Sequence, residues 1–215
     1  MNARHVPAVR VLRREEIGPA ARTLALAFDD DPIFRYLLPR ADQRAGWLRW
    51  FHTRTLTESF ISRGAHVIED GPQLGVIGLF APGAWPPRFL STLRAAPLPR
   101  HLPTLRLLTA GLPIEAQMRV RHPRAPHVYV YVVGVHPTRK GQGLGGALLR
   151  KAVDDADRAG VAAYLETSNP VNLDLYRRFG FEVDGEIRVG AAPTVWTMTR
   201  PAALSDQSPG SGGTP

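Results

Sequence analysis

The chain has 215 residues, of which 44% are apolar, and 27 basic against 19 acidic side chains give it a formal net charge of +8. This length and composition suit one folded domain, or at most two small ones, and they exclude a disordered chain. Cysteine is absent, which excludes disulfide scaffolds, thiolate metal sites and a cysteine nucleophile.

The N-terminal part of the sequence predicts short strands alternating with helices. Apolar residues recur at helical spacing from Ile17 to Phe28, and the acidic run Asp29-Asp30-Asp31 with Pro32 predicts the end of that helix. Asp70-Gly71-Pro72 is a turn of hairpin length between two apolar runs. The elements expected here are a strand over 8–12, helices over 17–28 and 48–60, and hairpin strands over 66–69 and 74–80.

The C-terminal part gives stronger signals. Residues 81–126 are rich in proline and predict a variable insertion with a broken helical excursion over 101–120. Gly160 and Gly180 each follow a helical pattern, and they predict that the helix ends there with the glycine in the left-handed backbone conformation. The expected elements are a strand over 127–135 with a bulge at Gly134, a helix over 148–159, a strand over 162–166, a helix starting at Asn169-Pro170, and strands over 181–189 and 195–199. We expect a single domain over 8–202 and a disordered tail over 203–215.

A glycine-rich segment, residues 139–146, joins the clearest strand to the clearest helix. Glycines let successive backbone N–H groups turn towards one concavity, and the N-terminus of the following helix adds partial positive charge, so a pyrophosphate fits there. The spacing matches neither a Walker loop nor the Gly-x-Gly-x-x-Gly dinucleotide fingerprint. Glycine turns also occur in plain packing roles, so the strand-loop-helix context carries this prediction.

In this context the segment Lys140-Gly141-Gln142-Gly143-Leu144-Gly145 resembles the pyrophosphate loop of the GNAT superfamily of acetyl-coenzyme A dependent N-acetyltransferases, with Lys140 where the superfamily has Gln or Arg. The rest of that signature is present in order. Val133-Gly134-Val135-His136-Pro137 precedes the loop, and Leu165-Glu166-Thr167-Ser168, Asn172, Tyr176 and Phe179-Gly180-Phe181 follow it. From about 127 to 200 the chain is also similar to puromycin N-acetyltransferase-like proteins.

The resemblance implies an α/β (α+β) fold, a GNAT-like central mixed β-sheet of about six to seven strands that is splayed at the cofactor strands and flanked by helices. It implies acetyl-CoA (coenzyme A) as cosubstrate and direct transfer of the acetyl group to a primary amine of a small molecule or peptide. The residues implied in cofactor binding are Val133, Gly134, Val135, Lys140, Gly141, Gln142, Gly143, Leu144, Gly145, Gly146, Asn172 and Tyr176.

Two residues are candidates for the chemistry of transfer. The resemblance implies that Tyr176 is the general acid, because a phenol with a pKa of about 10 stays protonated and can donate to a leaving thiolate with a pKa of about 8.5. An amphipathic Tyr packed between helix and sheet is the alternative. Glu166 is a candidate base for the amine, directly or through water, and the alternative is a structural carboxylate that caps a turn or pairs with an arginine.

Several features leave two interpretations open. Asp29-Asp30-Asp31 is either a solvated helix end or a set of acids beside an acceptor cleft that attracts a cationic amine. Aromatic residues at helical spacing are either core or a wall for the acceptor. They are Phe28, Phe34, Trp47, Trp50, Phe51 and Trp85.

The basic charge could serve a nucleic acid, a membrane surface or an anionic small molecule, and arginines spread along the whole chain favour a solvated surface over an anionic ligand. No nucleic-acid motif and no metal-ligand spacing appears, so we expect neither a nucleic-acid partner nor a metal. No stretch approaches the roughly 20 apolar residues that cross a bilayer, so we expect a cytoplasmic monomer or homodimer without a membrane partner. A catalytically silent CoA-binding or regulatory protein is the main alternative to an enzyme.

Overall fold

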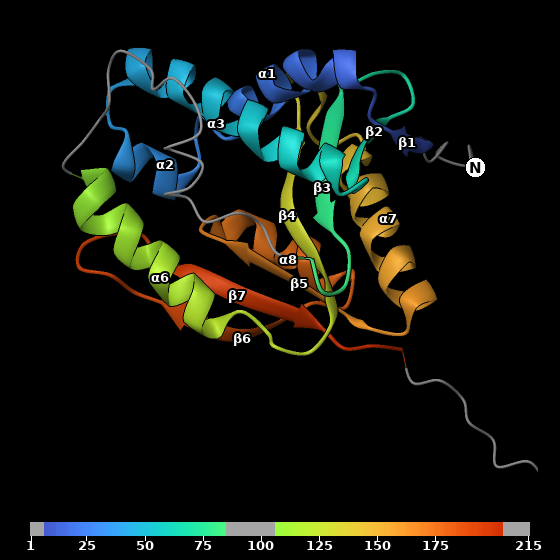
Figure 1. The fold of residues 1–215 in the computed structure, drawn as a ribbon. Coiled ribbons are helices and arrows are strands. Elements are labelled where there is room, and N and C mark those ends of the chain that lie inside the picture. The colour runs from blue at the N-terminus through green and yellow to red at the C-terminus, as the bar shows by residue number, and fades with distance from the viewer. Residues whose placement is uncertain (1–6, 85–105, 204–215) are drawn as a thin grey trace, which may run out of the picture.

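The computed structural model describes residues 7–84 and 106–203. Seven strands form one sheet in the order β1-β2-β3-β4-β5-β7-β6, and helices cover both of its faces (Figure 1). The strands are β1 (Val9–Val11), β2 (Ala65–Ile68), β3 (Gly75–Phe80), β4 (His127–Val135), β5 (Ala162–Thr167), β6 (Glu182–Ile187) and β7 (Val195–Arg200). The α-helices are α1 (Ile17–Ala27), α2 (Pro32–Leu37), α3 (Ala41–Ile61), α6 (Leu112–Arg121), α7 (Leu144–Ala159) and α8 (Leu173–Arg177). The mixed, helix-flanked sheet expected from the sequence is confirmed.

Two apolar layers hold the helices to the sheet. On one face Val76 of β3 packs with Leu24 of α1 and Leu56 of α3. On the other face Ile77, the next residue of the same strand, packs with Leu148 of α7. Successive residues of a strand point to opposite faces, so a strand that is apolar at every position supplies both layers at once.

The sheet opens between β4 and β5. These two strands run parallel, and their pairing extends from His127 opposite Ala162 to Val130 opposite Leu165. β4 continues to Val135 and β5 to Thr167 beyond the paired stretch. The expected splay at the strands of Val133 and Glu166 is therefore present.

A β-bulge lies on β4, although not where the sequence places it. Gly78 of β3 is opposite Val132 and Leu79 is opposite Val130, so Tyr131 is the extra residue. The expectation of a bulge at Gly134 is wrong, because Gly134 pairs in register with Val76. A Cβ atom at Gly134 would lie 2.8 Å from Leu24 Cδ2, so this glycine lets α1 approach the sheet closely.

Helix α2 was not expected. The Asp31-Pro32 pair ends the preceding turn and also starts a new helix, because Asp31 caps α2 and proline suits a first helical position. The predicted stops at Gly160 and Gly180 are confirmed, with φ values of 63° and 81°.

The described part of the proline-rich region, 106–126, holds a π-helical turn over Leu107–Gly111 followed by α6. The expected helical excursion is thus present over 107–121, next to the opening between β4 and β5 (Figure 1). Trp85 and the predicted disordered tail from residue 204 onwards lie outside the described residues.

Candidate active site

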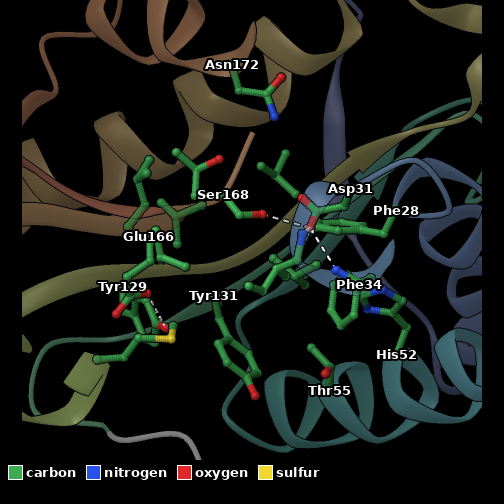
Figure 2. Close-up of a pocket in the computed structure, with 18 of the residues that line it drawn as sticks. Phe28, Asp31, Phe34, His52, Thr55, Tyr129, Tyr131, Glu166, Ser168 and Asn172 are labelled. Atoms are coloured by element: carbon green, nitrogen blue, oxygen red, sulfur yellow. Dashed lines mark hydrogen bonds between the residues drawn. The ribbon is translucent and has the colours of Figure 1, made fainter. Parts of the chain in front are cut away.

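A cavity occupies the opening between β4 and β5 (Figure 2). Both strands line it, together with α2, α3, α6 and α8, so its wall combines segments from the whole described chain. Four residues predicted for the site line it: Val133, Glu166, Asn172 and Tyr176. Gly134, Val135 and the glycine-rich loop do not belong to this lining.

Glu166 lies near the end of β5, and its side chain is 5% exposed. The Tyr129 hydroxyl donates a 2.6 Å hydrogen bond to Glu166 Oε2, and His122 Nδ1 lies 3.8 Å from Oε1. Burial, with the Glu166 carboxylate beside it, raises the pKa of Tyr129 well above its usual value. These contacts of Glu166 are with a tyrosine hydroxyl and a histidine imidazole, and neither is with an arginine.

Tyr176 is buried at the C-terminal half of α8. Burial raises the pKa of its hydroxyl to about 12, the negative charge of Asp31 adds to this rise, and a hydrogen bond from Thr167 opposes it. The phenol is therefore fully protonated at neutral pH and can donate a proton. Asn172, four residues earlier, lines the same cavity, as the helical spacing predicts.

Asp31 adds a second carboxylate to the cavity. Three groups donate to its Oδ1 atom: the Ser168 hydroxyl at 2.8 Å, the Ile33 N–H at 3.0 Å and the Phe34 N–H at 3.4 Å. Burial raises the pKa of this carboxyl, and the three hydrogen bonds oppose the rise. Because these donors all use Oδ1, Oδ2 is the oxygen that remains for a group in the cavity.

The other two acids of this run have different surroundings. Asp29 pairs with the buried Arg44 at 3.0 Å, and Asp30 lies 3.5 Å from Arg35 at an exposed position. The solvated-end interpretation therefore fits Asp30, whereas Asp31 lies beside the cleft, as the second interpretation proposes.

An aromatic wall from α1, α2 and α3 faces the two carboxylates. Phe28, Phe34 and Phe51 line the cavity, whereas Trp47 is only 2% exposed and belongs to the core. The aromatic residues thus divide between the two interpretations that the sequence left open. His52 stands among the three phenylalanines, with ring centroids 5.0 to 6.2 Å apart.

His52 is 1% exposed, and neither ring nitrogen has a hydrogen-bond partner among the described residues. Burial lowers its pKa to about 3, so the ring is neutral at physiological pH. A neutral imidazole presents one N–H donor and one acceptor nitrogen to the cavity.

The glycine-rich loop turns into α7 as expected, and its glycines serve two purposes. Gly141 and Gly143 have φ values of 78° and 82°, and a Cβ atom added at either would meet nothing within 4 Å, so an open concavity lies beside them. Gly145 is different, because its Cβ would lie 3.8 Å from both Leu175 and Val135 in the interior.

Helix α7 begins without a side-chain cap at Gly143 and without an acidic residue in its first turn. The first backbone N–H groups of a helix have no intrahelical acceptor, so they suit an anion. Leu144 contributes only its backbone, since its side chain is 5% exposed and lies in the core. Lys140 and Gln142 are exposed beside the loop. The residues present therefore fit a pyrophosphate.

Sequence reasoning did not place His52, His122 or Tyr129 in the site, it named Ser168 only within the family signature, and it left two interpretations open for Asp31. An Asp-Pro pair is a helix-cap signal that indicates where Asp31 lies locally, but no local signal brings it to Ser168, 137 residues away. No cluster of three potential metal-ligating residues occurs in 7–84 and 106–203. Within the same ranges no helix is long and apolar enough to cross a bilayer.

Two comparisons of the sequence with known proteins point to acetyltransferases. Residues 109–181 match the sequence model of the Acetyltransferase (GNAT) family. An uncharacterized N-acetyltransferase from Schizosaccharomyces pombe is 29% identical over 190 residues, covering 81% of this chain and 74% of the relative.

Solved structures share the fold. The crystal structure of a histone acetyltransferase HPA2 and related acetyltransferase from Corynebacterium glutamicum is 25% identical, with a TM-score of 0.65 over 93% of this chain and 98% of that chain. Arylalkylamine N-acetyltransferase 2 from Aedes aegypti is 11% identical, with a TM-score of 0.58 over 90% of this chain and 97% of that chain. The chain is therefore similar to the GNAT family in sequence over 109–181 and to an N-acetyltransferase over most of its length, and it shares its fold with solved acetyltransferase structures.

Proposed function

We propose that this protein transfers the acetyl group of acetyl-CoA directly to a primary amine, with Tyr176 as general acid. The observation that carries the proposal is the convergence of a protonated phenol and two carboxylates on one cavity at the splay of β4 and β5. The amine attacks the thioester carbon, the C–S bond breaks, and the departing thiolate takes the Tyr176 proton. The incoming ammonium gives up one proton to a base before the nitrogen attacks. The nitrogen gives up a second proton as the amide forms, and this proton returns the Tyr176 phenolate to the neutral phenol.

Glu166 takes the proton from the amine in this proposal, and Asp31 binds the incoming ammonium. Asp31 suits the binding role because it lines the cavity and its three hydrogen-bond donors all use Oδ1, which leaves Oδ2 for the ammonium. Glu166 suits the base role because its other neighbours are a tyrosine and a histidine, which can accept or stabilise charge. The aromatic wall of Phe28, Phe34 and Phe51 favours acceptors with an apolar body behind the amine.

The cofactor is proposed to lie with its pyrophosphate at the N-terminus of α7. The N–H groups from Gly141 to Gly146 hold the phosphates, with Lys140 and Gln142 beside them, and backbone groups of Val133, Gly134 and Val135 hold the pantetheine arm. Asn172 lies beside that arm at the cavity. The puromycin N-acetyltransferase-like subtype and a cytoplasmic location stay predictions of the sequence.

The experiment is thiol release from acetyl-CoA in the presence of a panel of primary amines. We expect release with at least one amine, and Tyr176→Phe to lower turnover by about 10²-fold while the affinity for CoA stays unchanged. Phe keeps the ring and its packing, so a general loss of folding is not expected. Binding of CoA without thiol release for every amine favours the silent CoA-binding protein, and unchanged turnover in Tyr176→Phe removes this residue from the chemistry.

A further inference from the structure

Two buried histidines lie next to each other beside Glu166, and the transfer chemistry above does not use them. His122 ends α6 and His127 begins β4, and the residues are 8% and 7% exposed. Their Nε2 atoms lie 3.0 Å apart. His127 Nδ1 lies 2.8 Å from the carbonyl oxygen of Ala125, which is exposed.

These contacts fix where the protons lie when both rings are neutral. A carbonyl oxygen only accepts, so His127 Nδ1 carries a hydrogen and its Nε2 is a lone pair. One proton must lie between the two Nε2 atoms, so it belongs to His122. Consequently His122 Nδ1 is also a lone pair, and it is the atom nearest to Glu166, 3.8 Å from Oε1.

The 3.8 Å separation follows from this assignment. An ionised carboxylate and an imidazole lone pair are both acceptors and do not form a hydrogen bond. Once Glu166 holds a proton, the same two atoms become donor and acceptor, and a small rotation of the carboxyl brings them within hydrogen-bond distance.

We propose that His122 and His127 relay to the protein surface the proton that Glu166 takes from the acceptor amine, an inference that rests on the proposed function. The proton on Glu166 Oε1 passes to His122 Nδ1, and His122 passes its Nε2 proton to His127 Nε2. His127 then releases its Nδ1 proton beside the Ala125 carbonyl. One proton enters and one leaves, Glu166 is ionised again, and both rings return to their first tautomers by rotation or by exchange with solvent.

The surroundings favour the neutral form of His127, so a proton that reaches this ring is readily given up. The rings of Tyr129 and Tyr164 pack edge-on to His122 at centroid distances of 4.8 and 5.0 Å. Burial lowers the pKa of His127, the neighbouring His122 lowers it further, and the Ala125 carbonyl and Glu166 oppose this. The charged and titratable groups that act on His127 are His122 and Glu166, and the rings of Tyr129 and Tyr164 pack against both histidines.

His127→Gln separates relay from structure, because the amide oxygen still accepts the His122 Nε2 hydrogen while the amide cannot carry a proton onward. We expect kcat to fall about tenfold, less than for loss of a direct catalytic group, with KM for both substrates and the thermal unfolding temperature unchanged. Added imidazole buffer is expected to restore kcat in this variant and to leave the native protein unaffected, because a small base can collect the proton. His122→Gln, with the same assays, is the second variant.

Unchanged kcat in both variants overturns the relay, and so does a lower kcat that imidazole does not restore. These outcomes differ from failure of the proposed function, in which the native protein itself releases no thiol with any amine. A loss of thermal stability that accounts for the whole loss of activity in both variants assigns the histidines a structural role and also overturns the relay.

Discussion

Replacing His52 with leucine tests the consequence of burying a histidine in an apolar wall. Burial lowers the pKa of His52 from 6.5 to about 3, so the folded protein keeps the ring neutral while the unfolded chain takes up a proton as the pH falls through 6.5. The unfolded state then binds more protons than the folded state, and stability is lost as the pH falls from 6.5 towards 3. His52→Leu removes this loss.

The size of the effect follows from the two pKa values. At pH 7 the unfolded chain is mostly neutral at this position, and the loss is about 0.2 kcal/mol. At pH 5 the unfolded histidine is almost fully protonated, and the loss is about 2 kcal/mol. We therefore expect the free energy of unfolding of His52→Leu, relative to the native protein, to rise by about 2 kcal/mol between pH 7 and pH 5.

The assay is urea unfolding followed by tryptophan fluorescence at pH 7, 6 and 5. His66 and His127 also have lowered pKa values, but they are present in both proteins and cancel in the difference. Phe51→Leu is the matched control, because Phe51 packs against His52 in the same wall and does not titrate. A difference between His52→Leu and the native protein that stays constant from pH 7 to pH 5 would refute the argument.

Three further substitutions test the phosphate loop, the amine site and the packing of the sheet. Gly143→Val places a branched side chain at a φ of 82° in the open concavity, so we expect the affinity for CoA, measured by calorimetry, to fall at least about tenfold. An unchanged affinity would mean that the cofactor binds elsewhere. Asp31→Asn keeps a good helix cap but removes the charge, so we expect KM for the amine to rise about tenfold while KM for acetyl-CoA stays constant. Equal changes in the two KM values would contradict the binding of the ammonium by Asp31. Gly64→Ala puts a Cβ atom 2.0 Å from the Leu79 carbonyl oxygen, so we expect the free energy of unfolding in urea to fall by about 3 kcal/mol. A fall below about 1 kcal/mol would contradict this close contact.

Local sequence patterns were sufficient to predict those elements whose structure depends only on neighbouring residues. Glycine at a left-handed position, an apolar stripe at helical spacing and a run of β-branched residues each act within a few neighbouring residues. For this reason the stops at Gly160 and Gly180, the strand over 127–135 and the loop before α7 could be predicted. The spacing of Asn172 and Tyr176 likewise placed both residues at one cavity.

The tertiary structure alone decided which distant residues meet. Asp31 reaches Ser168, and His122 reaches Glu166, because the packing of the helices against the sheet brings together segments that are far apart in the sequence. The bulge at Tyr131 is a property of the pairing between β3 and β4, which neither strand specifies alone. Contacts of this kind depend on how whole layers pack, and packing sums many weak apolar contacts over the entire core. The sequence therefore determined the glycine loop and the helix of Tyr176, because each depends on neighbouring residues. The two carboxylates and the histidines come together as one site only when the chain folds.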